Sequence, residues 1–158
     1  MEQLLQSQYP DVNISSRTMP QANAKNVKLA GKGRDFVVGT DEVTGLPIIK
    51  HIPFNERGMP IFDDVAVCDL RIPNKVASVR DRRTHFKEAT KQLKQLIETG
   101  IVDKGKFSAE QLQDISHCRG EITGFTWHHH EAIGRMQLVP RKLHKEIGHI
   151  GGFDLWFK

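Results

Sequence analysis

Residues 119–158 read RGEITGFTWHHHEAIGRMQLVPRKLHKEIGHIGGFDLWFK, and their pattern predicts an order of strands and helix. An apolar run leads into three consecutive histidines and predicts a strand that ends at them. Gly134 marks a turn, MQLVP reads as a second short strand, and the spacing beyond it predicts a helix that begins near Arg141. The order expected here is therefore strand, turn, strand, helix.

The histidines are concentrated in this same region. Six of the eight lie beyond residue 116, namely His117, His128, His129, His130, His144 and His149. Successive side chains of a strand face opposite ways, so His128 and His130 share one face and His129 lies on the other. Neighbouring histidines can therefore have different roles. His144 in the helix and His149 beyond it could approach the strand, which is the convergence of separate elements that a metal site needs.

His144 and His149 can bind one metal ion only if the helix ends between them. Five residues on a helix turn through about 140°, so the two rings cannot face one ion from a regular helix. Gly148 could end the helix and turn His149 back. A structural zinc site made of His128, His144 and His149 is the alternative. Structural sites usually include thiolates, whereas three imidazoles leave one position open, and this favours a functional metal site.

The rest of the chain completes a mixed α+β pattern. Residues 1–30 are polar without a sustained period and predict a linker or an N-terminal arm. Short β-rich runs over residues 34–72 predict an antiparallel hairpin or small sheet. A helix is expected from Val76 to Glu98, and a capping box of Ser108 with Gln111 opens a shorter helix that ends near His117.

Charge and composition narrow the class of protein. The 158 residues include 23 basic and 19 acidic side chains, a net charge of +4, and the whole excess lies beyond residue 75. No apolar run is long enough for a membrane span, and no secretory signal is visible, so export would need another route. The two cysteines, Cys68 and Cys118, are too far apart in sequence for a disulfide framework and are expected to be buried or unreactive thiols.

One face of the predicted long helix is basic. Its members fall within an arc of about 80° and are Arg80, Arg83, Lys87, Lys91 and Lys94. Two interpretations stay open at this point. The face is either a solvated surface with ion pairs to neighbouring acids or a stripe that follows nucleic-acid phosphates.

The segment TWHHHEAIGRMQLVPRKLHKEIGHIGG resembles the C-terminal nuclease module of bacterial polymorphic and colicin-like toxins, the WHH group of the HNH/endonuclease VII superfamily. The resemblance covers residues 119–158 closely, and FNERGMPIFDD, residues 54–64, is similar to a turn upstream in such domains. It implies a ββα-metal (His-Me finger) nuclease core at 119–158. That core would lie within a toxin nuclease domain at 31–158, with the N-terminal hairpin and the helices as additions.

The resemblance also implies roles for the histidines. His128 matches the first metal ligand, and His129 matches the general base. His144 matches the ligand on the helix, and His149 matches the last histidine, a ligand or a phosphate contact. His130 has no firm counterpart and could substitute for His128. Gln137 stands where many HNH proteins have an asparagine that pins the loop, and we expect it to be structural.

The implied reaction is hydrolysis of a phosphodiester with one divalent cation, Mg²⁺, Mn²⁺, Ni²⁺ or Zn²⁺. Candidate phosphate contacts, for which ordinary surface charge is an equal alternative, are Arg119, Arg135, Arg141 and Lys142 beside the motif and Arg80, Arg83 and Lys87 on the helix. Glu121, Glu131 and His130 are candidates for supporting the ligands. The aromatic residues Trp127, Phe153, Trp156 and Phe157 are assigned to packing.

The substrate and biological setting follow from the same resemblance. A metal-centred module held by backbone phosphates predicts a non-specific DNase, with RNA, including transfer RNA, as the alternative substrate. A toxin of this kind implies a larger secreted or injected effector, action in the target-cell cytoplasm, and an immunity protein with an acidic surface. Two other classes remain: an HNH endonuclease without an immunity partner, and a non-catalytic zinc-stabilised nucleic-acid-binding module.

Overall fold

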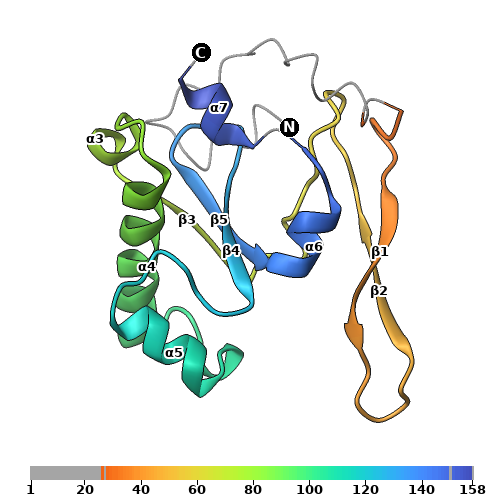
Figure 1. The fold of residues 1–158 in the computed structure, drawn as a ribbon, viewed down its shortest axis with the longest axis horizontal. Coiled ribbons are helices and arrows are strands. Elements are labelled where there is room, and N and C mark those ends of the chain that lie inside the picture. The colour runs from red at the N-terminus through yellow and green to blue at the C-terminus, as the bar shows by residue number, and fades with distance from the viewer. Residues whose placement is uncertain (1–25, 27, 150, 158) are drawn as a thin grey trace.

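The computed structural model describes residues 26, 28–149 and 151–157, and its architecture is α+β as predicted (Figure 1). Of the predicted N-terminal arm, residues 1–25 and 27 lie outside the described residues. No helix of the described part is long and apolar enough to cross a membrane.

The central sheet has three antiparallel strands in the order β3-β5-β4. They are β3 (Cys68–Arg71), β4 (Phe125–His129) and β5 (Arg135–Pro140). The histidine-bearing strand and the second short strand therefore form as predicted, and Gly134 takes the left-handed conformation (φ 86°) in the turn between them. His128 pairs with Gln137 across the two strands, and His129 pairs with Met136. β4 is an edge strand, so one of its sides is open to other groups.

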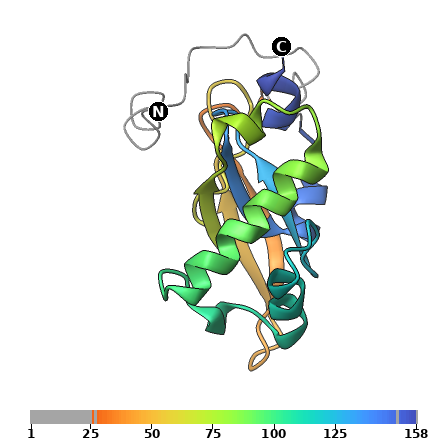
Figure 2. The same ribbon diagram turned by 90° about the vertical axis from the view of Figure 1, so that its left-hand side faces the viewer.

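Helices cover one face of the sheet (Figure 2). They are α3 (Asn74–Ala77), α4 (Arg82–Glu98) and α5 (Ala109–Ser116), with a 3-10 turn, η2 (Lys104–Lys106), before α5. Ala89 and Leu93 of α4 are fully buried against Leu70, Leu138 and Trp127. Burial of this apolar stripe is the main stabilisation of the helix.

Two sequence predictions concern this helical layer. The continuous helix expected over residues 76–98 is wrong, because the chain breaks after Ala77 and Asp81 caps a new helix. The Asp81 carboxylate accepts hydrogen bonds from the backbone N–H groups of Arg83 and Thr84, which satisfies donors that a helix leaves open at its start. The capping box of Ser108 and Gln111 is confirmed, with both reciprocal bonds present.

The opposite face of the sheet is covered by α6 (Arg141–Glu146), which follows β5 directly as predicted. Beyond α6 lies the predicted hairpin, formed by β1 (Arg34–Thr40) and β2 (Pro47–Ile52) (Figure 1). The last of the β-rich runs over residues 34–72 does not join it, because β3 pairs with β5 in the central sheet. A second apolar cluster joins these parts and includes Phe36, Ile52, Phe54, Phe62, Val139, Leu143 and Ile147. The histidine strand is thus held between two separate cores.

The cysteines and the aromatic residues have the structural roles expected of them. Cys68 is buried, and burial raises the pKa of its thiol to about 12, so the thiol stays protonated and unreactive. Cys118 is half-buried, and both cysteines are free. Trp127 and Trp156 are buried in the first core, and Phe157 packs against it.

The short helix α7 (Gly152–Trp156) closes the end of the histidine strand. The indole N–H of Trp156 donates to the carbonyl oxygen of His130 at 2.8 Å. Gly152 lies so close that an added Cβ would stand 1.8 Å from the same oxygen, and that oxygen belongs to backbone. The close approach of α7 therefore requires glycine at this position.

We expect Gly152→Ala to lower the free energy of unfolding by about 3 kcal/mol or more, because backbone must move to accept the methyl group. Gly151→Ala is the matched control, because no atom lies within 4 Å of its added Cβ and its φ of −74° suits any residue. Thermal and urea unfolding of the two variants test the difference. Equal stabilities of the two variants would show that α7 does not pack as described.

Candidate metal centre

The alternation of β4 separates its side chains between the two cores. Trp127 faces the helical layer, where its indole N–H donates to the hydroxyl of Thr90 at 3.0 Å. His128 faces the opposite side, towards α6, and its ring meets Phe62 edge-on with 4.8 Å between centroids. Phe62 also contacts the rings of His144 and His149, each with centroids 5.8 Å away. The fully buried ring of Phe62 therefore packs against all three imidazoles.

His128, His144 and His149 converge through their ring nitrogens. Nδ1 of His128 lies 3.2 Å from Nε2 of His144 and 3.2 Å from Nε2 of His149. One nitrogen from each ring lies within 4.8 Å of the other two. Three ligands placed tetrahedrally at about 2.05 Å from zinc are about 3.3 Å apart, so the spacing from His128 suits a single small ion. We call this triad the histidine cluster.

The surroundings keep the cluster in the form that binds metal. Burial and the neighbouring histidines lower the pKa of His128 well below its usual value. Burial and the nearby His149 lower the pKa of His144 to about 4. The rings of His128 and His144 are therefore neutral near pH 7, with lone pairs available as ligands. His149 is oriented by its own backbone, because its Nδ1 donates to the carbonyl of Ile147 at 2.7 Å and leaves Nε2 as the acceptor.

The helix ends earlier than the sequence suggested. Glu146 is the last residue of α6 and Ile147 caps it, so Gly148 does not itself end the helix. His149 lies outside the helix, so the rotation of about 140° that a regular helix would place between it and His144 does not apply. The carbonyl of Gly148 accepts a hydrogen bond from the Asn26 amide at 2.9 Å, which fixes the returning chain.

His129 lies on the other side of the strand, within an aromatic cage. Its Nε2 is 2.9 Å from Nδ1 of His85 on α4. The rings of Phe86, Phe153 and Trp156 surround it, with centroids at 5.4, 5.2 and 4.9 Å. Burial, followed by His85, lowers the pKa of His129 to about 3, so its ring is neutral. The structure therefore places His129 and the histidine cluster on opposite faces of β4.

His130 belongs to a different network and does not join the histidine cluster. Its Nδ1 accepts the backbone N–H of Ala132 at 3.0 Å, and its Nε2 lies 3.3 Å from the guanidinium of Arg135. Arg135 is itself buried, with paired contacts to Asp69 and a further contact to Asp63. Arg135 was a candidate phosphate contact, but it is enclosed by carboxylates and supports the sheet.

Other candidates for supporting or phosphate-binding roles are also occupied. The carboxylate of Glu131 pairs with Arg57 at 2.6 Å and accepts the Asn55 amide at 2.9 Å, away from the histidine cluster. Arg119 pairs with Asp114 at 2.6 Å. Gln137 donates to Asp63 and Asp69, each at 2.9 Å, which agrees with the structural role expected of it.

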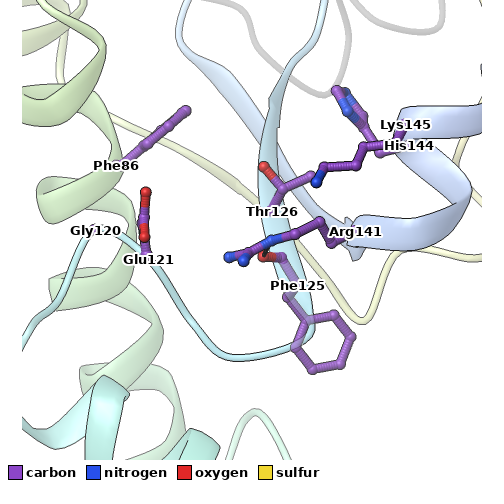
Figure 3. Close-up of a pocket in the computed structure, with 8 residues that line it drawn as sticks. All are labelled: Phe86, Gly120, Glu121, Phe125, Thr126, Arg141, His144 and Lys145. Carbon is purple, nitrogen blue, oxygen red and sulfur yellow. Dashed lines mark hydrogen bonds between the residues drawn. The ribbon is translucent and has the colours of Figure 1, made fainter. Parts of the chain in front are cut away.

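A cavity of about 300 Å³ opens beside the edge of β4, between α4 and α6 (Figure 3). It is lined by Phe86, Gly120, Glu121, Phe125, Thr126, Arg141, His144 and Lys145. We call it the β4 groove. His144 belongs both to its wall and to the histidine cluster.

Cations dominate the charge of the β4 groove. Arg141 is held in place because its Nε donates to the carbonyl of Phe125 at 3.1 Å. Lys145 extends from the same helix, and Glu121 stands on the opposite wall (Figure 3). Of the predicted phosphate contacts, the structure brings Arg141 to this groove, together with the predicted supporting residue Glu121. Lys87 is exposed on α4 and is not among the residues that line it.

The remaining basic candidates lie on the surface. Arg80, Arg83 and Lys142 are exposed. The guanidinium of Arg80 lies over the ring of Phe157, with 5.8 Å to the centroid. The basic stripe on α4 is interrupted by ion pairs near its end, where Lys91 approaches Glu88 and Lys94 approaches Glu98.

Sequence reasoning missed His85 and Lys145. His85 stands four residues before Ala89 and eight before Leu93, so its place on the apolar face of α4 was visible in the sequence. Its partner, His129, could not be inferred, because the contact joins residues that are distant in sequence. Lys145 follows His144 directly, but only the position of α6 against β4 directs it to the groove.

Comparison with known proteins identifies one similarity. The family model described as the DNase/tRNase domain of colicin-like bacteriocin matches residues 52–151. This range contains the histidine cluster, His85, His129 and the β4 groove. No curated protein and no solved structure matches the chain.

Proposed function

The chain belongs to the family of DNase/tRNase domains of colicin-like bacteriocins, and we propose that it is a metal-dependent endonuclease that hydrolyses DNA with little sequence preference. Membership of the family makes it a nuclease domain of toxin type. The metal dependence rests mainly on one observation, the convergence of three imidazoles from β4, α6 and the turn after α6. A groove with fixed cations beside them supports a phosphodiester substrate.

The residues of the histidine cluster suit a divalent ion. The nitrogens of His144 and His149 each lie 3.2 Å from Nδ1 of His128, which is the spacing of two ligands on one small ion, and three imidazoles leave at least one coordination position open. When bound, such an ion would polarise a non-bridging phosphate oxygen and stabilise the negative charge that develops in the transition state. The hydrogen bond from His149 to Ile147 would keep one ligand aligned throughout.

We assign the proton transfer to His129. It faces the other side of β4 from the histidine cluster, but Phe86, whose ring contacts His129, and His144 of the cluster both line the β4 groove, so a phosphate at this edge of the strand would lie between the two sides. The neutral ring of His129 would take a proton from the attacking water, the water oxygen would bond to phosphorus, and the bond from phosphorus to the 3′-oxygen would break. The leaving oxygen would take a proton from solvent. Burial lowers the pKa of His129, and an anionic phosphate bound nearby would raise that pKa again, which strengthens the base when substrate is present.

Arg141 is the cation that we expect to hold the substrate backbone. Its Nε donates to the carbonyl of Phe125 and its Nη2 to that of Ile122, so the guanidinium is held in place and the N–H groups left over can bind phosphate with little loss of side-chain entropy. We expect Arg141→Ala to weaken binding of duplex DNA about tenfold and to reduce the salt dependence by about one phosphate contact. Fluorescence anisotropy over a salt series, with the metal omitted, measures both effects.

Lys50→Ala is the control for this prediction. Lys50 is exposed on the β1–β2 hairpin, outside the β4 groove, and its loss removes the same unit of charge. We expect its DNA affinity to stay within twofold of the parent chain. Equal weakening by both substitutions would mean that overall charge, rather than the groove, determines binding.

Substrate choice is tested by incubating the metal-loaded chain with plasmid DNA and with total transfer RNA at equal nucleotide concentration. We expect DNA to be cut and the fragment ends to show little sequence preference. Cleavage of transfer RNA alone would overturn the DNA assignment while leaving the histidine cluster and its chemistry in place. If neither DNA nor transfer RNA is cut, the proposal that the chain is an enzyme is contradicted.

The biological setting is part of the same proposal. A nuclease of low specificity would damage the cell that makes it, so we propose a cognate immunity protein with an acidic surface that covers the basic groove. We further propose that the domain, residues 31–158, is secreted or injected as part of a larger effector and acts in the cytoplasm of a competing bacterium.

A further inference from the structure

His85 is a buried imidazole to which the proposed reaction gives no role. It is fully buried on α4, and its Nδ1 lies 2.9 Å from Nε2 of His129. Its other nitrogen, Nε2, is also buried and completes no hydrogen bond among the described residues. The ring lies within the same aromatic cage, 5.4 Å from Trp156 and 5.7 Å from Phe153. A second histidine is costly at such an apolar position, because an apolar side chain would pack there without a polar atom to satisfy.

The contact between the two rings permits only two arrangements of protons when both are neutral. If Nδ1–H of His85 donates, the Nε2 lone pair of His129 is occupied, and the proton of His129 stands on Nδ1. If Nε2–H of His129 donates, His85 accepts, and the Nδ1 lone pair of His129 is free. Only the second arrangement leaves His129 able to accept a proton from water.

The proposed role of His129 selects the second arrangement. A base needs a free lone pair, and the contact with Nδ1 of His85 at 2.9 Å already engages Nε2 of His129, so only Nδ1 of His129 can offer one. In this arrangement the proton of His85 stands on Nε2, and Nδ1 of His85 is the acceptor.

We propose that His85 is a positioning residue for hydrolysis, which accepts the Nε2–H of His129 and so holds the Nδ1 lone pair of His129 ready as the base. This inference rests on the proposed function, in which His129 is the base. It adds a partner from α4, more than forty positions earlier in the chain, to the strand that carries the reaction. The arrangement follows the general pattern in which a catalytic base is oriented by a second hydrogen-bonding group.

The test compares His85→Leu with His85→Asn under saturating metal. Leucine fills the space but cannot accept a hydrogen bond, whereas the Asn amide oxygen can stand close to the position of Nδ1. We expect kcat for plasmid cleavage to fall about 100-fold in His85→Leu, with KM changed by less than threefold. We expect His85→Asn to retain kcat within tenfold of the parent chain.

Thr90→Val controls for disturbance of the same buried layer. Thr90 is fully buried on α4, and its hydroxyl accepts the indole N–H of Trp127, so this variant also loses a buried hydrogen bond. We expect it to lose stability and to keep kcat. Affinity for Zn²⁺ alone, measured by calorimetry, should be unchanged in all three variants because the histidine cluster lies across the strand.

The outcomes separate the inference from the function on which it rests. Full kcat in a folded His85→Leu chain would overturn the positioning role while His129→Gln remains inactive. Equal loss in His85→Leu and His85→Asn, with stabilities matching that of Thr90→Val, would also overturn it. Full activity of His129→Gln would instead refute the assignment of the base.

Discussion

Replacing His144 with alanine is expected to weaken the affinity for Zn²⁺ or Ni²⁺ by at least 100-fold and to abolish nuclease activity. Disturbing residues that only support a ligand commonly costs about 10- to 100-fold in metal affinity, so direct loss of a ligand should cost at least the upper value. We expect a large effect at His144 because its Nε2 contacts Nδ1 of His128 and because the residue also lines the β4 groove. Competition with a chromogenic chelator measures the affinity.

His117→Ala is the matched control for the loss of one imidazole. His117 is exposed at the end of α5 and is not a member of the histidine cluster. We expect this variant to bind metal like the parent chain. Undiminished binding by His144→Ala would place the metal elsewhere and would refute the histidine cluster as the metal centre.

Loss of His129 is expected to remove most of the catalytic rate while the metal stays bound. General base catalysis contributes about 10²- to 10⁴-fold, so kcat for plasmid cleavage should fall by about 10³-fold in His129→Gln. Glutamine is preferable to alanine here because the cage of Phe86, Phe153 and Trp156 would be left with a cavity by alanine. Its amide can also donate to Nδ1 of His85.

Single-turnover cleavage and Zn²⁺ calorimetry on the same preparation separate chemistry from folding. An unchanged metal affinity with a lost rate is the predicted pair of results. A rate within threefold of the parent chain would show that another group takes the proton from water. His129→Ala should be inactive too, but with a lower melting temperature.

The local pattern of the sequence predicted the elements of the site well. Alternation along a strand placed His128 and His129 on opposite faces, and the structure confirms that they meet different partners. The strand, the turn at Gly134, the second strand and the helix from Arg141 all form where the periodicity placed them. These features depend on residues that are close in the chain, so their pattern can be recognised in the sequence.

Long-range contacts were beyond the same reasoning. Arg135 flanks the motif and looked available to phosphate, but Asp69 from β3 and Asp63 enclose it. His85 belongs to the site only because α4 packs across β4, and the break before α4 depends on the cap that Asp81 provides. The packing of α6 against β4 determines which basic side chains reach the groove. That packing depends on contacts between distant parts of the chain, so local spacing does not reveal it.

Hydrolysis by this chain should depend on an ion held by His128, His144 and His149. The direct measurement is cleavage of plasmid DNA by the chelator-treated chain, alone and after adding back Mg²⁺, Mn²⁺, Ni²⁺ or Zn²⁺, with His128→Ala as the second sample. We expect no cleavage without metal, restored cleavage with at least one of the four ions, and none by His128→Ala under any of them. Cleavage by the parent chain in the presence of excess chelator, or restored activity in His128→Ala, would show that hydrolysis does not depend on an ion at the histidine cluster.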